Sequence, residues 1–124
     1  MTVLVDSDVL IEVLRGRDAE ILARWAELAD SKDAVLCSPV SVAEVWHGVR
    51  PKEHAVVARL LGALLCVPIH AETGQQAGQY LREYHKSHGV ELGDALIAAA
   101  AAQHHAALWT RNRKHYPMRA LNFY

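Results

Sequence analysis

Three carboxylates occur at positions where the sequence predicts that helices begin. Asp6 directly follows the apolar run at residues 3–5, Glu44 lies within residues 41–45, and Asp94 is near the start of residues 93–98. On an α/β scaffold these side chains could meet at one edge of a sheet. Three close carboxylates repel one another, and a divalent cation removes that repulsion. Oxygen ligands suit Mg²⁺ or Mn²⁺ rather than Zn²⁺, and such ions support phosphodiester hydrolysis.

Each of these acids also has a purely structural explanation. Asp6 or Asp8 is a competent N-cap for the first helix. Glu44 matches the last position of a capping box that begins at Ser41, although Ser38, followed by Pro39, is also a candidate N-cap for the same helix. Asp94 is well placed to complement a helix dipole. Taken singly, each structural explanation is about as good as the functional one, and only the shared edge favours a common site.

The elements that would position these acids alternate between strand and helix. Apolar runs predict strands at residues 3–5, 34–37, 66–69 and 107–110, and more weakly at 120–123. Helical spacing predicts helices after Asp6, after Asp18, from about 39 to 48, from 51 to 64, from 71 to 85 and from 94 to 105. This alternation predicts a parallel sheet with helices on both faces. Ligands bind beyond the carboxyl ends of the strands in such sheets, and Asp6 and Thr110 directly follow two of them.

The composition is that of an ordinary globular protein. The chain has 124 residues, of which 52% are hydrophobic and 22% charged, so we expect residues 1–124 to form a single domain. No apolar run approaches the roughly 20 residues of a membrane-spanning helix. The start of the chain lacks a basic region and cleavage site typical of a signal peptide. We therefore expect a cytoplasmic protein.

The formal net charge is −1, so a nucleic-acid ligand would need a local basic patch. The strongest basic cluster lies near the C-terminus, and its alternative explanation is a solvated surface. We expect the contacts to a nucleic-acid backbone to come from Thr110, Arg111, Arg113 and Lys114. Basic contacts of this kind make binding weaker as salt is added.

Cysteine, histidine and tryptophan point less clearly to function. Cys37 and Cys66 lie in apolar stretches, and we expect two buried thiols that behave as small hydrophobes. The eight histidines lack the tight Cys and His spacing of a structural zinc site. Trp25 and Trp46 fall on apolar helix faces, which favours packing in the core or at a dimer interface over base stacking.

Four ordered segments resemble the motifs of a known nuclease family. They are residues 5–12, 38–44, 93–99 and 109–112. Together they look like the successive motifs of PIN-domain nucleases, in particular the VapC-like toxins of bacterial toxin–antitoxin pairs. Each motif alone is loose, but the ordered set spans almost the whole chain.

The resemblance implies a three-layer α/β/α fold with a short, mostly parallel five-stranded sheet. It also implies Mg²⁺- or Mn²⁺-dependent endonucleolytic cleavage of RNA, a small antitoxin partner and a homodimer. By motif position, Asp6 and Asp94 would be the principal metal ligands, with Glu44 as the third acid. The family usually has a fourth acidic or polar residue after the last core strand. Asn112 holds that position here, which departs from the most acidic form of the motif, and it completes the expected catalytic set. His115 could contact RNA or protonate a leaving group, or be a surface residue.

Two alternatives remain open at the level of sequence. Because Asn112 brings no charge, a PIN-like module that binds RNA or protein without cutting it is one alternative. The segment from Asp6 to Asp8 also resembles the first motif of haloacid-dehalogenase-like phosphatases, which carry a DxD sequence. Those enzymes need Gly and Thr soon after the second Asp, whereas Val9 and Leu10 follow here.

Overall fold

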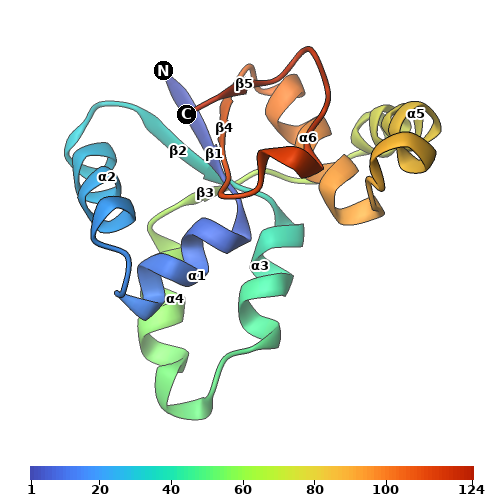
Figure 1. Ribbon diagram of the computed structural model, residues 1–124. Helices are drawn as coiled ribbons and strands as arrows, with labels where there is room; N and C mark the ends of the chain where they lie inside the picture. The colour runs from blue at the N-terminus through green and yellow to red at the C-terminus, as the bar shows by residue number, and fades with distance from the viewer.

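Five short parallel strands form one sheet in the order β3-β2-β1-β4-β5 (Figure 1). The computed structural model describes residues 1–124. The strands are β1 (Thr2–Val5), β2 (Ala34–Cys37), β3 (Leu65–Cys66), β4 (Ala107–Trp109) and β5 (Asn122–Phe123). β1 lies at the centre between β2 and β4. α1 and α2 connect β1 to β2, and α5 and α6 lie in the crossover that leads from β3 to β4. The predicted parallel sheet is confirmed, and every strand pair in it is parallel.

Six α-helices cover the two faces of the sheet (Figure 1). They are α1 (Ser7–Arg15), α2 (Ala19–Asp30), α3 (Pro39–His47), α4 (His54–Gly62), α5 (Ala71–His88) and α6 (Leu92–Gln103). Single 3₁₀ turns occur at Pro51–Glu53 (η1) and Arg113–His115 (η2). The predicted three-layer α/β/α architecture is confirmed.

Side-chain alternation along β1 explains why both faces need cover. Val3 and Val5 pack on one face in a core shared with α1, α2 and α4. Leu4 points to the other face, where the core is built mainly from α5 and α6. The run of alanines in α6 has small side chains, so this helix packs closely against the sheet. Both faces of β1 are therefore apolar, as expected of a central parallel strand.

Several element boundaries differ from those predicted. β3 ends at Cys66 rather than near residue 69, because Pro68 has no N–H to donate to the sheet. α5 continues to His88 and ends at Gly89, whose positive φ of 67° suits glycine. α4 begins at His54, after the 3₁₀ turn η1 rather than at residue 51.

The two cysteines lie in register on neighbouring strands, and both are free thiols. Cys37 is buried, whereas Cys66 is exposed, so the prediction of two buried thiols is wrong for Cys66. The reason is that β3 is the edge strand and carries no neighbour on its outer side. Burial, with a smaller contribution from Cys66, raises the pKa of the Cys37 thiol to about 12.

The tryptophans occupy three different environments. Trp109 is buried between Trp25 and Tyr124, with ring-centroid distances of 6.2 and 5.1 Å. Trp25 thus packs partly in the core, as expected. Trp46 is 37% exposed and lies edge-on against His54, so it does not pack in the core. Of the two expected roles, packing at a dimer interface stays a prediction. None of the helices combines the length and apolar character needed to cross a membrane.

Candidate functional site

The candidate site lies where β1 and β4 end side by side. Val5 and Trp109 are register partners, and the backbone N–H of Asp6 donates to the carbonyl oxygen of Trp109 at 2.9 Å. Asp6 and Thr110 therefore follow adjacent parallel strands at the same edge. The hydroxyl of Thr110 donates to Asp6 Oδ2 at 2.9 Å across 104 residues of sequence.

Asp6 is buried and accepts three hydrogen bonds. As the N-cap of α1, it accepts the backbone N–H of Ser7 on Oδ1 at 2.8 Å. Its Oδ2 accepts the Thr110 hydroxyl and also the phenol of Tyr116, whose oxygen lies 2.7 Å away. The capping role and a functional role are therefore compatible in one side chain.

Asp8 lies beside Asp6 and is incompletely paired. Its Oδ2 accepts the backbone N–H of Arg111 at 3.1 Å and faces the Thr110 hydroxyl at 3.4 Å. Its Oδ1 is buried without any hydrogen-bond partner. Burial, followed by repulsion from Asp6, raises the pKa of Asp8 to about 6. An unpartnered carboxylate oxygen of this kind is suited to bind a cation.

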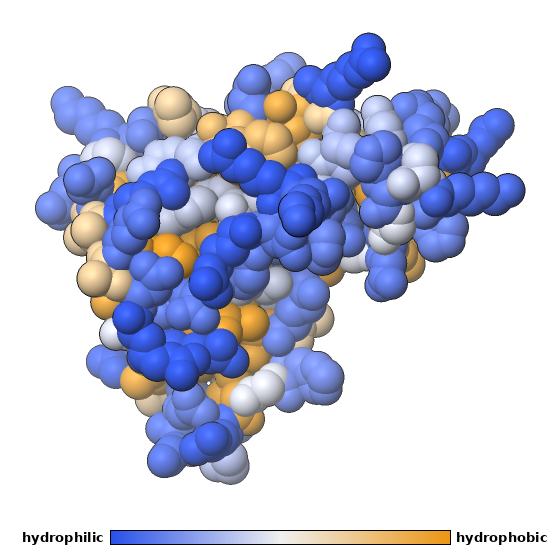
Figure 2. Space-filling view, in the orientation of Figure 1, coloured by the Kyte–Doolittle hydropathy of each residue, from blue (hydrophilic) through white to orange (hydrophobic).

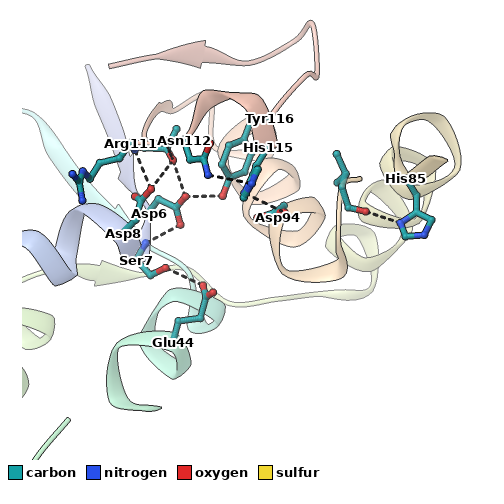
Figure 3. A network of polar contacts seen from close by, with 12 residues as sticks. Asp6, Ser7, Asp8, Glu44, His85, Asp94, Arg111, Asn112, His115 and Tyr116 are labelled. Atoms are coloured by element: carbon teal, nitrogen blue, oxygen red, sulfur yellow. Dashed lines mark hydrogen bonds and ion pairs between the residues drawn. The ribbon is translucent and has the colours of Figure 1, made fainter. Parts of the chain in front are cut away.

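Glu44 reaches the same region from α3. The sequence predicted that it lies in the first turn of that helix, and the structure places it further along the helix. α3 begins at Pro39 and is capped by Ser38, whose Oγ accepts the Val40 N–H at 3.1 Å. Ser41 is therefore already inside the helix, so the predicted capping box with Glu44 is wrong. Instead, Glu44 Oε1 accepts the Ser7 hydroxyl at 3.1 Å (Figure 3).

Burial is the main cause of the raised pKa of Glu44, and repulsion from Asp6 and Asp94 adds to it. Asp94 lies in the first turn of α6, as predicted, and is half-buried. Its pKa is also raised, chiefly by burial and to a smaller extent by Asp6. The three predicted acids thus come from three separate parts of the chain, and the charge of Asp6 contributes to the raised pKa values of Glu44 and Asp94.

Asn112 and His115 form the side of the site that faces Asp94. The amide nitrogen of Asn112 lies 3.1 Å from His115 Nε2, and His115 Nδ1 lies 3.9 Å from Asp94 Oδ2 (Figure 3). An amide NH₂ can only donate, so this contact requires Nε2 to accept, which is the tautomer that carries the ring proton on Nδ1, toward Asp94. The amide of Asn112 therefore contacts this histidine and none of the acids.

The residues predicted to bind substrate have different environments. Thr110 is buried, and its hydroxyl bonds Asp6 and accepts the Asn112 N–H at 3.1 Å. Arg111 pairs with Glu12 at 3.1 Å, and Arg113 lies over the Phe123 ring at 4.8 Å. Lys114 is exposed. Of the four, Thr110 contacts Asp6 through its side chain and Arg111 contacts Asp8 through its backbone N–H, whereas Arg113 and Lys114 make no hydrogen bond to the site acids.

Sequence reasoning missed three contacts within the site. The Ser7 hydroxyl, the Glu12 carboxylate and the Tyr116 phenol all take part in side-chain contacts there. Ser7 and Glu12 lie inside the first motif segment, so their proximity to Asp6 was a usable signal. Tyr116 lies 110 residues from Asp6, and no local pattern indicates that the two side chains meet.

The carboxylates do not form a preformed metal-binding site. No three His, Cys, Asp or Glu side chains converge closely enough to hold an ion as they stand. The donor chemistry nevertheless fits a hard cation, because oxygen ligands gather here with raised pKa values and one orphaned buried oxygen.

A hollow beside Glu44 is lined by residues of α1, α3, α4 and the segment that connects α3 to α4. It has a volume of about 160 Å³ and an apolar floor that includes Ile11, Val45 and Val57, with Arg15 and Glu44 among its charged lining residues. Figure 2 shows apolar atoms in this region on an otherwise largely hydrophilic face. A second groove, of about 390 Å³, is lined by α2, β2 and the segment around β3 and contains none of the three acids.

Comparisons with known proteins identify the family of this chain. Residues 3–121 match the PIN domain family. The chain is 41% identical over 118 residues to Ribonuclease VapC10 of Mycobacterium tuberculosis, covering 94% of this chain and 86% of that protein.

Solved structures share the fold over nearly the whole chain. VapBC2 from Rickettsia felis, bound to a promoter DNA fragment, matches with a TM-score of 0.82 at 20% identity and covers 100% of this chain and 98% of that one. A toxin–antitoxin complex from Klebsiella pneumoniae matches with a TM-score of 0.73 at 24% identity and covers 96% and 94%. With the family match over residues 3–121 and the relative at 41% identity, the chain belongs to the PIN-domain family, in its group of VapC ribonucleases.

Proposed function

We propose that this VapC-family ribonuclease cleaves RNA endonucleolytically with Mg²⁺ or Mn²⁺ bound by Asp6, Asp94 and Glu44. The observation that carries the proposal is that these acids come from three elements and that charge repulsion from Asp6 contributes to the raised pKa values of the other two. A divalent cation would relieve that repulsion. When bound, such an ion lowers the pKa of a water molecule and stabilises charge that develops on a phosphate.

The residues of the chain have distinct proposed roles. Asp6 is the principal ligand on the sheet, since it is buried and already held by three donors. Asp94 is the second ligand, and Glu44 is the third acid, which binds metal or positions water. Asp8 is a further candidate, since its buried Oδ1 has no other partner. Asn112 completes the catalytic set as an uncharged fourth position and helps to orient His115.

RNA is the proposed substrate, and exposed cations near the acids would bind its backbone. Arg113 and Lys114 lie in η2, directly after Asn112, and both are exposed. Arg111 would add a third contact, although its guanidinium now pairs with Glu12 at 3.1 Å. Thr110 is assigned to the site for its bond to Asp6 rather than for reaching substrate.

A protein antitoxin and a second copy of this chain are the proposed partners. Support for the antitoxin comes from the fold match to a toxin–antitoxin complex. The homodimer rests on family resemblance and on exposed apolar residues such as Val56 on α4, which is 50% exposed. Several other apolar residues of α4 pack against the core and do not offer a free surface.

The proposed activity is tested by cleavage of structured RNAs with and without Mg²⁺ or Mn²⁺. Wild-type protein should cut in the presence of either ion and lose activity in EDTA. Asp6→Asn and Asp94→Asn should lower the rate by at least about 100-fold, since each removes a charged ligand. Asp30→Asn, an exposed acid at the end of α2, is the matched control and should cut normally.

Two outcomes would contradict the proposal. One is a wild-type protein that binds RNA but cuts none with either ion, which would favour the binding-only alternative. The other is undiminished cleavage by both Asp6→Asn and Asp94→Asn. The match to the PIN family over residues 3–121 already favours the nuclease over a haloacid-dehalogenase-like phosphatase.

A further inference from the structure

The Tyr116 phenol is an unusual feature of the site because it is fully enclosed and directed at a carboxylate. Tyr116 is 3% exposed, and its oxygen lies 2.7 Å from Asp6 Oδ2. Burial, and then the charge of Asp6, raises the pKa of Tyr116 well above that of a free phenol, so the hydroxyl remains a donor. A hydrogen bond from a neutral hydroxyl to an ionised carboxylate is among the stronger ones in proteins.

The donors around Asp6 leave little freedom to its carboxylate. An ionised carboxylate offers about four lone-pair positions. Tyr116 and Thr110 both donate to Oδ2, and the Ser7 N–H donates to Oδ1. Three positions are thus filled, and the remaining one lies on Oδ1.

We propose that Tyr116 is a positioning residue that, together with Thr110, holds Asp6 so that it presents one Oδ1 lone pair to a divalent cation. This inference rests on the proposed metal-dependent function and adds a residue that the motif comparison did not assign. Asp6 would then bind the ion through one oxygen rather than two. Donors that orient metal ligands in this way commonly contribute 10- to 100-fold to metal affinity.

The position of Tyr116 in the chain explains how its phenol is held. The backbone N–H of Tyr116 donates to the carbonyl of Arg113 at 2.9 Å, which closes the turn η2. Its ring packs in the same core as Met118 and Leu121. The phenol is therefore fixed from the C-terminal segment, independently of α1, which carries Asp6 at its cap.

Titration with Mn²⁺ alone, without RNA, tests the inference by calorimetry. Tyr116→Phe keeps the ring in the core and removes only the hydroxyl, so we expect the dissociation constant for Mn²⁺ to rise about 10- to 100-fold. Tyr80→Phe is the matched control, because Tyr80 is a buried tyrosine of α5 whose hydroxyl contacts none of the site acids. Its Mn²⁺ affinity should equal that of wild type.

The outcomes separate this inference from the function on which it rests. If wild type binds Mn²⁺ and folded Tyr116→Phe binds it equally well, the positioning role is wrong while the metal site stands. If wild type does not bind Mn²⁺, the proposed metal-dependent function is wrong, and the inference about Tyr116 is wrong as well. If circular dichroism shows that Tyr116→Phe does not fold, the Mn²⁺ affinities of Thr110→Val and Thr110→Ser test whether donors to Asp6 Oδ2 support metal binding. Tighter binding by the serine variant, which keeps a hydroxyl, supports the inference, and equal binding overturns it.

Discussion

Burial and charge repulsion together raise the pKa values of individual carboxylates in the site. Asp8, Glu44 and Asp94 all have raised pKa values, and in each case burial is the largest cause. The charge of Asp6 adds to all three. A protein without a use for these charges would gain stability by losing them, so their cost is measurable.

Replacing Asp8 by Asn should stabilise the metal-free protein at pH 8. The folded-state pKa of Asp8, about 6, lies above the ordinary value of 3.8 for this side chain, so folding favours the protonated form. The stability that the protonated Asp8 contributes is fully present below its pKa in the unfolded chain, and it is lost as the pH rises through about 6, its pKa in the folded protein. Because Asp8 is partly exposed and solvent screens it, we expect a gain of about 1 kcal/mol at pH 8 and a smaller one at pH 4.5.

Urea unfolding in EDTA at the two pH values measures this difference. The Asn amide oxygen can still accept the backbone N–H of Arg111, so the variant keeps that contact. Asp30→Asn, on the surface, should show no pH-dependent gain. A less stable Asp8→Asn protein at pH 8 would contradict the assigned repulsion.

The two cysteines should differ sharply toward iodoacetamide at pH 8. Cys66 is exposed and should be alkylated in the folded protein. Cys37 is buried and its pKa is raised to about 12, so its thiolate is scarce and inaccessible. Mass spectrometry of peptides should find Cys37 modified only after unfolding. Equal labelling of both in the folded state would show that β3 opens readily.

At the scale of elements, sequence patterns predicted which segments are helices and strands better than where they begin. Apolar runs and helical spacing identified all five strands and all six helices. Both Ser38 and Ser41 were competent N-caps for α3, and only the backbone geometry shows that Ser38 is used. Because α3 begins directly after Ser38, Glu44 lies beyond the first turn of this helix. Local chemistry did not decide between the two serines because both satisfied the same rule.

Glycine substitutions should have opposite effects at helix ends and helix interiors. Gly16 ends α1 with φ of 67°, which an alanine adopts only with strain, so Gly16→Ala should destabilise by about 1 kcal/mol. Gly74 lies inside α5 with open space around it, so Gly74→Ala should stabilise by about 0.5–1 kcal/mol. Thermal unfolding of both variants checks the opposite signs, and a shift in the same direction for both would contradict the helix assignments.

At the scale of the whole molecule, the parallel sheet gathers residues that are far apart in sequence. Asp6 was expected at the edge of the sheet beside Thr110, and the structure confirms this placement. The contacts of Asp6 with Tyr116 and of Glu12 with Arg111 span about 100 residues. Such contacts depend on the path of the C-terminal segment after β4, which no periodicity encodes. The fold and the positions of the main acids were therefore predictable, whereas the long-range contacts made by Tyr116 and Arg111 were not.

RNA binding should depend on salt through the basic residues near this edge. In the cleavage-impaired Asp94→Asn background, Lys114→Gln should reduce the dependence of log affinity on log salt by about 0.7, the value for one single-stranded phosphate contact. Lys32, which precedes β2 at the opposite edge of the sheet, provides the control variant Lys32→Gln. Fluorescence anisotropy across salt concentrations measures both slopes. Identical slopes for the two variants would place the RNA elsewhere.

The most direct test of a shared metal site is an X-ray structure of crystals soaked in Mn²⁺, with the ion located by anomalous scattering. We predict one peak bound by Asp6 through Oδ1 and by Asp94, with Glu44 turned toward it. Crystals of Asp94→Asn soaked in the same way should lose or weaken that peak. A Mn²⁺ ion bound away from Asp6 and Asp94, or an undiminished peak in Asp94→Asn, would contradict the assignment of these carboxylates to one metal centre.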